Sequence, residues 1–380
     1  MTKNIYITLF LSFSVLFGQT LSVDECVRIA LENKAGVKRA EQDTKIAQLN
    51  RVSAIGMLLP TLRASNSFSE TTYGNSSLST ERHGAGISLN QNLFNSGNNA
   101  RNVKQSNNNY FIAKENERQS KSRIILNVYT YYYQLLKNKE LFAIAEKNLE
   151  LSSRQLDLVE RQYNLGSVSR TDYLKASVRY GTAKSTLLSR RLNRDNSEQT
   201  LKNGMGILEK NIELKVRDKV NIELIVPNFN EAYEIMIQNS PELRILDAQI
   251  ATAQLNLRSA WGSSLPSLNL SVGMNASSSE KITSEFFDDN YIKSANLTLS
   301  IPIFSGLKNR NSVEISKMRF GQSKMMYGSK RKDAKVSLSS LLNTLKNYEE
   351  LIPIYEEVLV SAEEDLRLAQ NKYELGSATI

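Results

Sequence analysis

The sequence predicts a mainly α-helical fold with added membrane-spanning β-strands, built from two copies of one unit. Three observations predict it: an uninterrupted heptad ladder in each of two long segments, short segments with alternating apolar residues, and a nearly constant spacing between matching motifs. Heptad ladders are typical of coiled coils, and alternating segments are typical of β-hairpins. We therefore expect a long coiled-coil helical barrel, together with a β-barrel to which each protomer of a trimer contributes strands.

The two long helical segments, residues 97–166 and 307–376, carry an apolar residue at every seventh position. Such a strict repeat indicates helices packed in a left-handed supercoil. The first segment contains no proline, so at about 1.5 Å per residue it extends roughly 100 Å. An ordinary antiparallel coiled coil is the simpler interpretation of the ladder alone. The ladders are Val128, Leu135, Phe142, Leu149, Leu156 and Tyr163 and, 210 positions later, Leu338, Leu345, Ile352, Leu359, Leu366 and Tyr373.

A second set of motifs indicates that the whole unit is duplicated. The tetrapeptide Ala-Gln-Leu-Asn at 47–50 recurs unchanged at 253–256, an offset of 206 that also relates Pro60 to Pro266. Each motif lies in a helical pattern, the first with a break near Gly36. The offset becomes 210 in the long helices, so the second copy has gained four residues between these points.

The domain organisation follows from the duplication. Residues 21–205 are expected to form the first repeat (helix, β-hairpin, long helix, tip and return helix), 206–229 a linker with a short strand, and 230–380 the second repeat. The return helix at 170–204 opens with a predicted capping box over 169–172. No matching return helix follows the second tip, so we expect the second repeat to be truncated after that tip.

Between the helices the hydrophobic period changes from helical to two. Soluble β-sandwiches show the same alternation. We favour strands that cross a membrane with their apolar face toward lipid, because the chain has an export signal (described below), no disulfides and long flanking helices. Four strands cannot close a barrel and lipid tolerates no open sheet edge, so several chains must pool their strands, and a trimer supplies twelve. The alternating residues are Leu268, Leu270, Val272, Met274 and Ala276; Ala295, Leu297, Leu299, Ile301 and Ile303; and, more faintly in the first copy, Ala85, Ile87, Leu89 and Leu93.

The N-terminus and the composition limit the class of protein. Residues 1–20 predict a secretory signal peptide, with Lys3 before an apolar stretch at 5–17, and the only cysteine, Cys26, is expected to be a small buried residue. The net charge of +9 is dispersed among acidic residues along the helices, which argues against nucleic-acid binding. The sole histidine, His83, has no partners at catalytic or metal-ligand spacing, so we expect no enzyme activity, cofactor or metal.

The order of helix, hairpin, long helix, tip and return helix resembles the TolC family of outer-membrane efflux proteins over essentially all of residues 21–380. The resemblance implies a trimer with a twelve-stranded barrel in the outer membrane and a helical tunnel across the periplasm. It also implies that an inner-membrane pump delivers drugs, metals or proteins through a periplasmic adaptor. The most specific motifs are Leu-Pro at 59–60 and 265–266, Leu-Phe-Asn-Ser-Gly at 93–97, Pro-Ile-Phe-Ser-Gly at 302–306, and the tip stretch at 161–174.

The resemblance further implies two sets of site residues. Other interpretations stay open, because Gly166 and Gly376 are typical helix ends, Asp172 also fits the capping box, and Tyr373 is the last rung of its ladder. Ala378 stands where some family members carry a gate arginine, which puts an ionic latch in doubt. The implied adaptor-docking tips are Leu165, Gly166 and Ser167 with Leu375, Gly376 and Ser377, and the implied periplasmic gate is Thr171, Asp172 and Tyr373.

The expected function is therefore a passive outer-membrane channel-tunnel of a tripartite efflux or type I secretion system. The alternative is a soluble, exported coiled-coil scaffold or adaptor protein. The two differ at the hairpins, because a channel needs the apolar residues of the strands to face lipid. The cargo, the pump and the adaptor are not specified by any motif.

Overall fold

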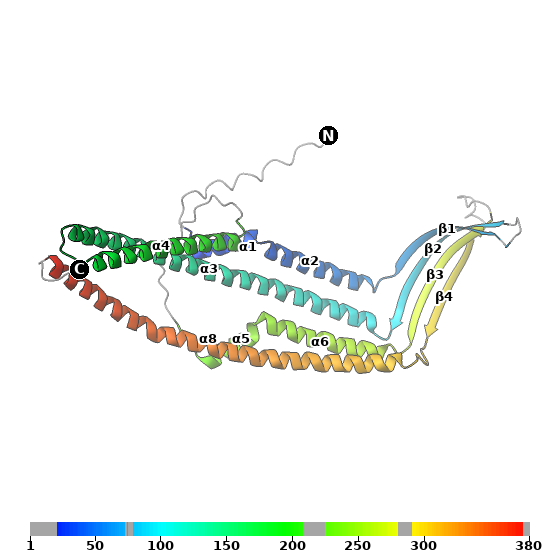
Figure 1. The fold of residues 1–380 in the computed structure, drawn as a ribbon. Coiled ribbons are helices and arrows are strands. Elements are labelled where there is room, and N and C mark those ends of the chain that lie inside the picture. Colours follow the sequence, from blue (N-terminus) through cyan, green and yellow to red (C-terminus); the bar gives the residue numbers. More distant parts are fainter. Residues whose placement is uncertain (1–20, 73, 75–78, 208–224, 280–290, 375–380) are drawn as a thin grey trace, which may run out of the picture. The chain divides into compact units, whose positions relative to one another are not determined.

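The computed structural model describes residues 21–72, 74, 79–207, 225–279 and 291–374, so the predicted signal peptide and most of the linker lie outside the described residues. Each half of the chain contains two shorter helices, two strands and a long helix in the same order (Figure 1). The elements are α1 (Val23–Asn33), α2 (Ala35–Gly56), β1 (Thr61–Thr72), β2 (Ser79–Asn95), α3 (Asn98–Asn164), α4 (Arg170–Met205), α5 (Phe229–Asn239), α6 (Pro241–Gly262), β3 (Ser267–Ser278), β4 (Tyr291–Ser300) and α8 (Lys308–Glu374).

The chain forms two compact units, each made of two separate stretches of sequence: residues 1–42 with 117–223, and 43–116 with 224–380. The first unit contains α1, most of α3, and α4; the second contains the sheet, α5, α6 and α8. No helix in the described part of the chain is both long and apolar enough to cross a membrane.

The core of the first unit lies where α1, α3 and α4 meet. The Tyr132 hydroxyl donates to the Leu21 carbonyl at 3.1 Å, and Ser22 begins α1 with a complete capping box to Glu25. Cys26 is fully buried, and that burial raises the pKa of its thiol to about 12, which confirms its expected role as a buried residue. The buried cluster comprises Leu21, Cys26, Ile29, Ala30, Val128, Tyr132, Leu135, Leu201 and Met205.

Both long helices lie within the predicted segments and have 67 residues each, but their ladders are packed differently within the chain. In α3, Val128 and Leu135 are fully buried, whereas Tyr163 near the end of the helix is 37% exposed. In α8, Leu359 and Leu366 are each 58% exposed. The heptad pattern therefore predicts both helices, and only the first ladder is buried deeply inside this chain.

The four strands form one antiparallel sheet in the order β1-β2-β3-β4, so the two predicted hairpins join through β2 and β3. The register places Leu62, Leu89, Val272 and Ala295 in one row across the sheet. A bulge between Asn92 and Phe94 interrupts β2 close to its helical end. The prediction that Ile301 and Ile303 belong to the last strand is wrong: β4 ends at Ser300, before Pro302, which has no N–H for the ladder.

A two-residue left-handed turn leads from each hairpin into its long helix. Ser96 and Gly97 have φ of 59° and 75°, and Gly306 and Leu307 have φ of 60° and 66°. These pairs match at the offset of 210, so the glycine occupies the second position in one repeat and the first in the other. In the first turn, Arg101 donates to the carbonyl of Ser96 and, at 3.1 Å, to the hydroxyl of Ser259 on α6.

Leu307→Gly is expected to raise the free energy of unfolding by about 1 kcal/mol. A left-handed φ costs a residue with a Cβ about 1–2 kcal/mol, and glycine is also the better residue at the start of a helix. Leu307 is 57% exposed, so little packing is lost. The denaturant midpoint of the purified protein checks this, with Gly306→Ala as the control that should lower the midpoint. A lower midpoint for Leu307→Gly would mean that the leucine side chain stabilises more than its backbone costs.

Candidate functional site

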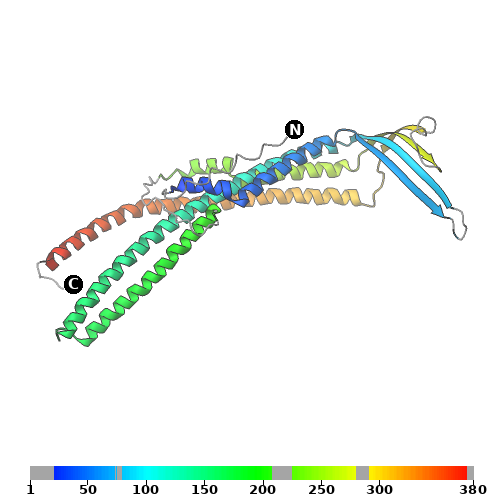
Figure 2. The same ribbon diagram turned by 90° about the horizontal axis from the view of Figure 1, so that it is seen from above.

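The tip of the α3–α4 hairpin is built from two linked helix ends (Figure 2). At the end of α3, the Ser167 N–H donates to the Gln162 carbonyl and the Gly166 N–H donates to the Tyr163 carbonyl, both at 2.9 Å. This is the Schellman pattern, and it needs a left-handed residue, which Gly166 supplies with φ of 74°. Gly166 therefore does end a helix, as the alternative interpretation expected.

The start of α4 supports the capping interpretation of Asp172. Ser169 is the N-cap, and its hydroxyl accepts a hydrogen bond from the Asp172 N–H at 3.2 Å. The same hydroxyl donates to the Asp172 carboxylate at 2.7 Å, so the carboxylate contacts the hydroxyl of the cap residue rather than its backbone N–H. Asp172 is also an acidic residue in the first turn, where it interacts favourably with the helix dipole.

The contact with Ser169 has a consequence for the protonation of Asp172. Hydrogen bonding from the Ser169 hydroxyl lowers the pKa of the Asp172 carboxyl below its usual value. A carboxyl whose folded-state pKa is lowered stabilises the fold above its unfolded-state pKa, and this contribution is lost as the pH falls through the folded-state pKa. The tip therefore carries a carboxylate that stays charged at neutral and mildly acidic pH.

The tip is exposed around this frame. Leu165 is 81% exposed, and a Cβ added at Gly166 would meet nothing within 4 Å. Across the hairpin, the rings of Tyr163 and Tyr173 stack with centroids 5.5 Å apart. The Leu165 side chain and the Gly166 backbone are therefore accessible from solvent.

The predicted site residues fall into three groups. The tip residues Leu165, Gly166 and Ser167 lie together between α3 and α4, and Thr171 and Asp172 lie beside them in the first turn of α4. Tyr373 lies in the last turn of α8, in the other compact unit. The second predicted tip, at 375–377, lies outside the described residues.

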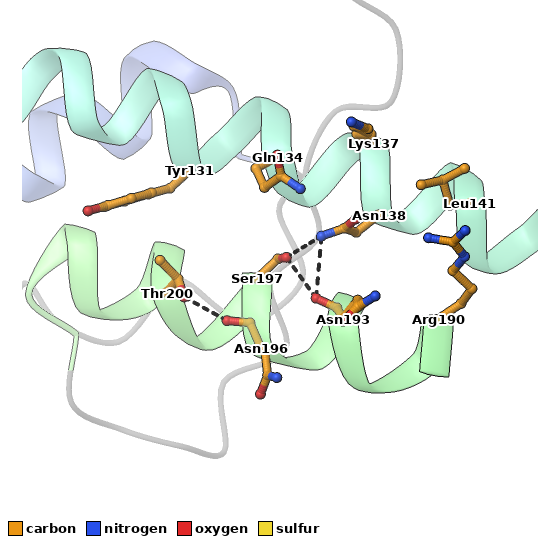
Figure 3. A pocket seen from close by; sticks show the side chains of 10 residues that line it. All are labelled: Tyr131, Gln134, Lys137, Asn138, Leu141, Arg190, Asn193, Asn196, Ser197 and Thr200. Carbon is orange, nitrogen blue, oxygen red and sulfur yellow. Dashed lines mark hydrogen bonds between the residues drawn. The ribbon is translucent and has the colours of Figure 1, made fainter. Parts of the chain in front are cut away.

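A polar layer between α3 and α4 was not expected from the sequence. Asn138, 9% exposed, donates to the Ser197 hydroxyl, which itself donates to the Asn193 carbonyl at 2.7 Å. Asn138 lies three residues after Leu135, at a seam position where a buried polar residue fixes helix register. Beside it is a groove of about 470 Å³ (Figure 3), lined by Tyr131, Gln134, Lys137, Asn138, Leu141, Arg190, Asn193, Asn196, Ser197 and Thr200.

The sheet has one apolar and one polar face. Paired residues in an antiparallel sheet share a face, so Leu270 and Leu297 lie together on the apolar face, and Ser271 and Asn296 lie together on the other. Leu297 is 64% exposed, which is unusual for the apolar side of a sheet in contact with water. Both edges of the sheet, β1 and β4, have a strand neighbour on one side only.

The profile of the outer membrane efflux protein family matches residues 26–206 and 232–380, once over each repeat. The chain belongs to this family. The match covers both long helices and the strands of each half, which is consistent with the internal duplication.

Two relatives in this family illustrate the extent of the similarity. Outer membrane protein TolC of Escherichia coli K12 is 23% identical over 270 residues, which cover 68% of this chain and 54% of that protein. The outer membrane efflux protein BepC of Brucella suis is 23% identical over 240 residues, 63% of this chain and 51% of that protein. The chain therefore spans about half the length of these relatives.

Two solved structures show the same fold. The CmeC outer membrane channel of Campylobacter jejuni has a TM-score of 0.79 at 16% identity, covering 94% of this chain and 78% of that one. VceC of Vibrio cholerae has a TM-score of 0.78 at 15% identity, covering 94% and 87%. The fold of long helices and strands, built from two repeats, is therefore confirmed for this chain.

Proposed function

We propose that this protein is the outer-membrane channel-tunnel of a tripartite efflux or type I secretion system, through which substrates pass from an inner-membrane pump to the exterior. The observation that carries the proposal is the exposed apolar face of the four-stranded sheet, in a chain of the outer membrane efflux protein family. A soluble scaffold would have to keep side chains such as Leu297 and Leu299 in water, which favours aggregation.

The sheet also supports assembly into a homotrimer. A sheet of four strands leaves two edges, and lipid provides no hydrogen-bonding partner for the unpaired backbone groups of an edge strand. Pairing β1 of one protomer with β4 of the next removes every edge, and three protomers give a barrel of twelve strands. The polar face then surrounds an aqueous lumen. Passive conduction of this kind requires no cofactor.

Reconstitution into a planar bilayer tests the proposed conduction. The full-length gene product, purified from outer membranes, should give discrete single-channel conductance steps. A protein that binds to the bilayer without conducting would contradict the proposal, because a lumen lined by polar side chains passes ions.

We further propose that Leu165, Gly166 and Ser167 contact a periplasmic adaptor protein. The support is the exposure of Leu165 on a turn whose left-handed residue is Gly166. Leu165→Glu is expected to weaken binding of the adaptor from the same organism by about tenfold or more, the usual loss for an apolar anchor. Site-specific cross-linking to the adaptor measures it, with Leu188→Glu as the control, because Leu188 is also an exposed leucine but lies on α4 away from the tip. Equal cross-linking by both variants would contradict docking at the tip.

The proposed periplasmic gate comprises Thr171, Asp172 and Tyr373. Asp172→Ala is expected to raise single-channel conductance in bilayers, because it removes a charged group that can hold neighbouring helices together. Ser169→Ala is the control, since it removes the cap hydroxyl but keeps the carboxylate. An increase in Asp172→Ala alone supports the gate, whereas an equal increase in both variants would assign Asp172 to capping only.

A further inference from the structure

The polar face of the sheet carries charge of one sign. Over the described strands β1 to β4, this face has two ionisable side chains, Arg63 on β1 and Arg82 on β2. Arg63 pairs with Ser88, and Arg82 pairs with Ser69. Paired residues share a face, and successive residues of a strand alternate between faces, so both arginines lie opposite the apolar face. Both arginines are exposed.

Arg63 and Arg82 have the longest side chains on the polar face of the sheet. The row through Arg63 continues across the sheet as Ser88, Gly273 and Ser294, all small residues. Arg82 lies one residue beyond the last pair between β2 and β3, toward the β1–β2 turn. Six residues along the strand separate the two levels, which corresponds to about 20 Å.

The acidic side chains of the strands lie on the opposite face. Glu70 and Glu81 pair with each other, two residues beyond the pair of Phe68 and His83 on the apolar side, and Glu81 lies 4.0 Å from the His83 ring nitrogen. The remaining strand cation, Lys293, also lies on the apolar side, opposite Met274. Over the described strands, the polar face therefore has no carboxylate that would neutralise Arg63 or Arg82.

We propose that the lumen of the β-barrel selects for anions, and that Arg63 and Arg82 form the two levels of positive charge responsible. This inference rests on the proposed trimeric channel, in which each level becomes a ring of three guanidinium groups. The second repeat adds no charge to the rings, because its counterparts of Arg63 and Arg82 are Asn269 and Ile292. Rings of arginine or lysine give pores a preference for anions. The cargo that this barrel passes most readily is therefore neutral or anionic.

The test is the reversal potential of single trimers in a planar bilayer under a potassium chloride gradient. The wild-type protein should be more permeable to chloride than to potassium. Three charges about 10 Å from a passing ion, screened by about 0.1 M salt, change its concentration by about twofold. Because each ring attracts chloride and repels potassium by the same factor, we expect Arg63→Gln and Arg82→Gln each to lower the chloride-to-potassium permeability ratio by about fourfold, and the double variant to lower it further.

Two variants make the test specific. Arg63→Lys keeps the charge and should keep the permeability ratio. Lys293→Gln removes a cation from the apolar face of the same sheet and should leave the ratio unchanged. A cation-selective wild-type channel would overturn the inference while leaving the proposed function intact, and so would arginine variants that shift no more than Lys293→Gln. A protein that forms no conducting trimer would overturn the proposed function, and the inference with it.

Discussion

Leu270→Arg is expected to prevent stable assembly of the protein in the outer membrane. Leu270 pairs with Leu297 on the apolar face of the sheet, well inside the strands. An arginine facing lipid near the middle of a bilayer costs about 2–4 kcal/mol, and a trimer would carry three of them. The measurement is the fraction of the protein recovered as folded trimer from outer membranes.

The sheet provides a matched control one residue away. Ser271 pairs with Asn296 on the polar face, so Ser271→Arg places the same side chain in the proposed lumen, where water surrounds it. We expect this variant to assemble normally. If Leu270→Arg assembled as well as Ser271→Arg, the apolar face would not contact lipid, and the barrel would be contradicted.

Leu135→Ala is expected to destabilise the junction of α1, α3 and α4 by about 2–5 kcal/mol, the usual cost of such a cavity in a packed core. Leu135 is fully buried in the cluster that also contains Cys26 on α1 and Leu201 on α4. Hydrogen–deuterium exchange followed by peptide mass spectrometry resolves this locally. Backbone exchange in α1 should accelerate roughly thirtyfold or more, since each 1.4 kcal/mol corresponds to about tenfold in the opening equilibrium.

The control for this prediction lies on the same helix. Leu126 is 66% exposed, so Leu126→Ala should change exchange in α1 by little. Unchanged exchange in Leu135→Ala would mean that α1 is held independently of the cluster. The comparison therefore tests whether this cluster is the structural core of the first unit.

The long-range pattern of the sequence predicts much of this fold because the pattern is repeated. The heptad ladders predict both 67-residue helices, and the alternation around Leu268 and Leu297 predicts both strands of the second hairpin. Those patterns describe which face of an element is apolar. They do not say what covers that face, which is why Leu135 and Leu359 occupy equivalent kinds of position and yet differ so strongly in burial.

Details that depend on single backbone torsions were not predictable in the same way. The shared Ser-Gly dipeptide suggests that Gly97 and Gly306 are equivalent, whereas the torsions match Ser96 with Gly306 and Gly97 with Leu307. A leucine with a positive φ contradicts local preference and is visible only in the structure. Asn138, by contrast, left a signal: it is a polar residue in a seam of the first coiled coil, between Tyr131 and Ala145.

The candidate site is predicted only in part for a related reason. The tip residues follow from a short motif whose turn chemistry is local, so Gly166 and Asp172 lie where the motif places them. The proposed gate would require Tyr373 of α8 to act with Thr171 and Asp172 of α4, and that prediction concerns the assembly of several chains rather than one helix. Sequence periodicity fixes where each residue lies on its own helix and leaves the partner helix undefined.

The measurement that tests the central claim most directly is a denaturing gel of outer-membrane fractions from cells expressing the full-length gene, run with and without heating. We expect a band at three times the monomer mass in the unheated sample that converts to the monomer on heating, because a closed barrel of twelve strands resists detergent. A protein found only in the soluble periplasmic fraction as a monomer would contradict the channel and favour the exported coiled-coil scaffold.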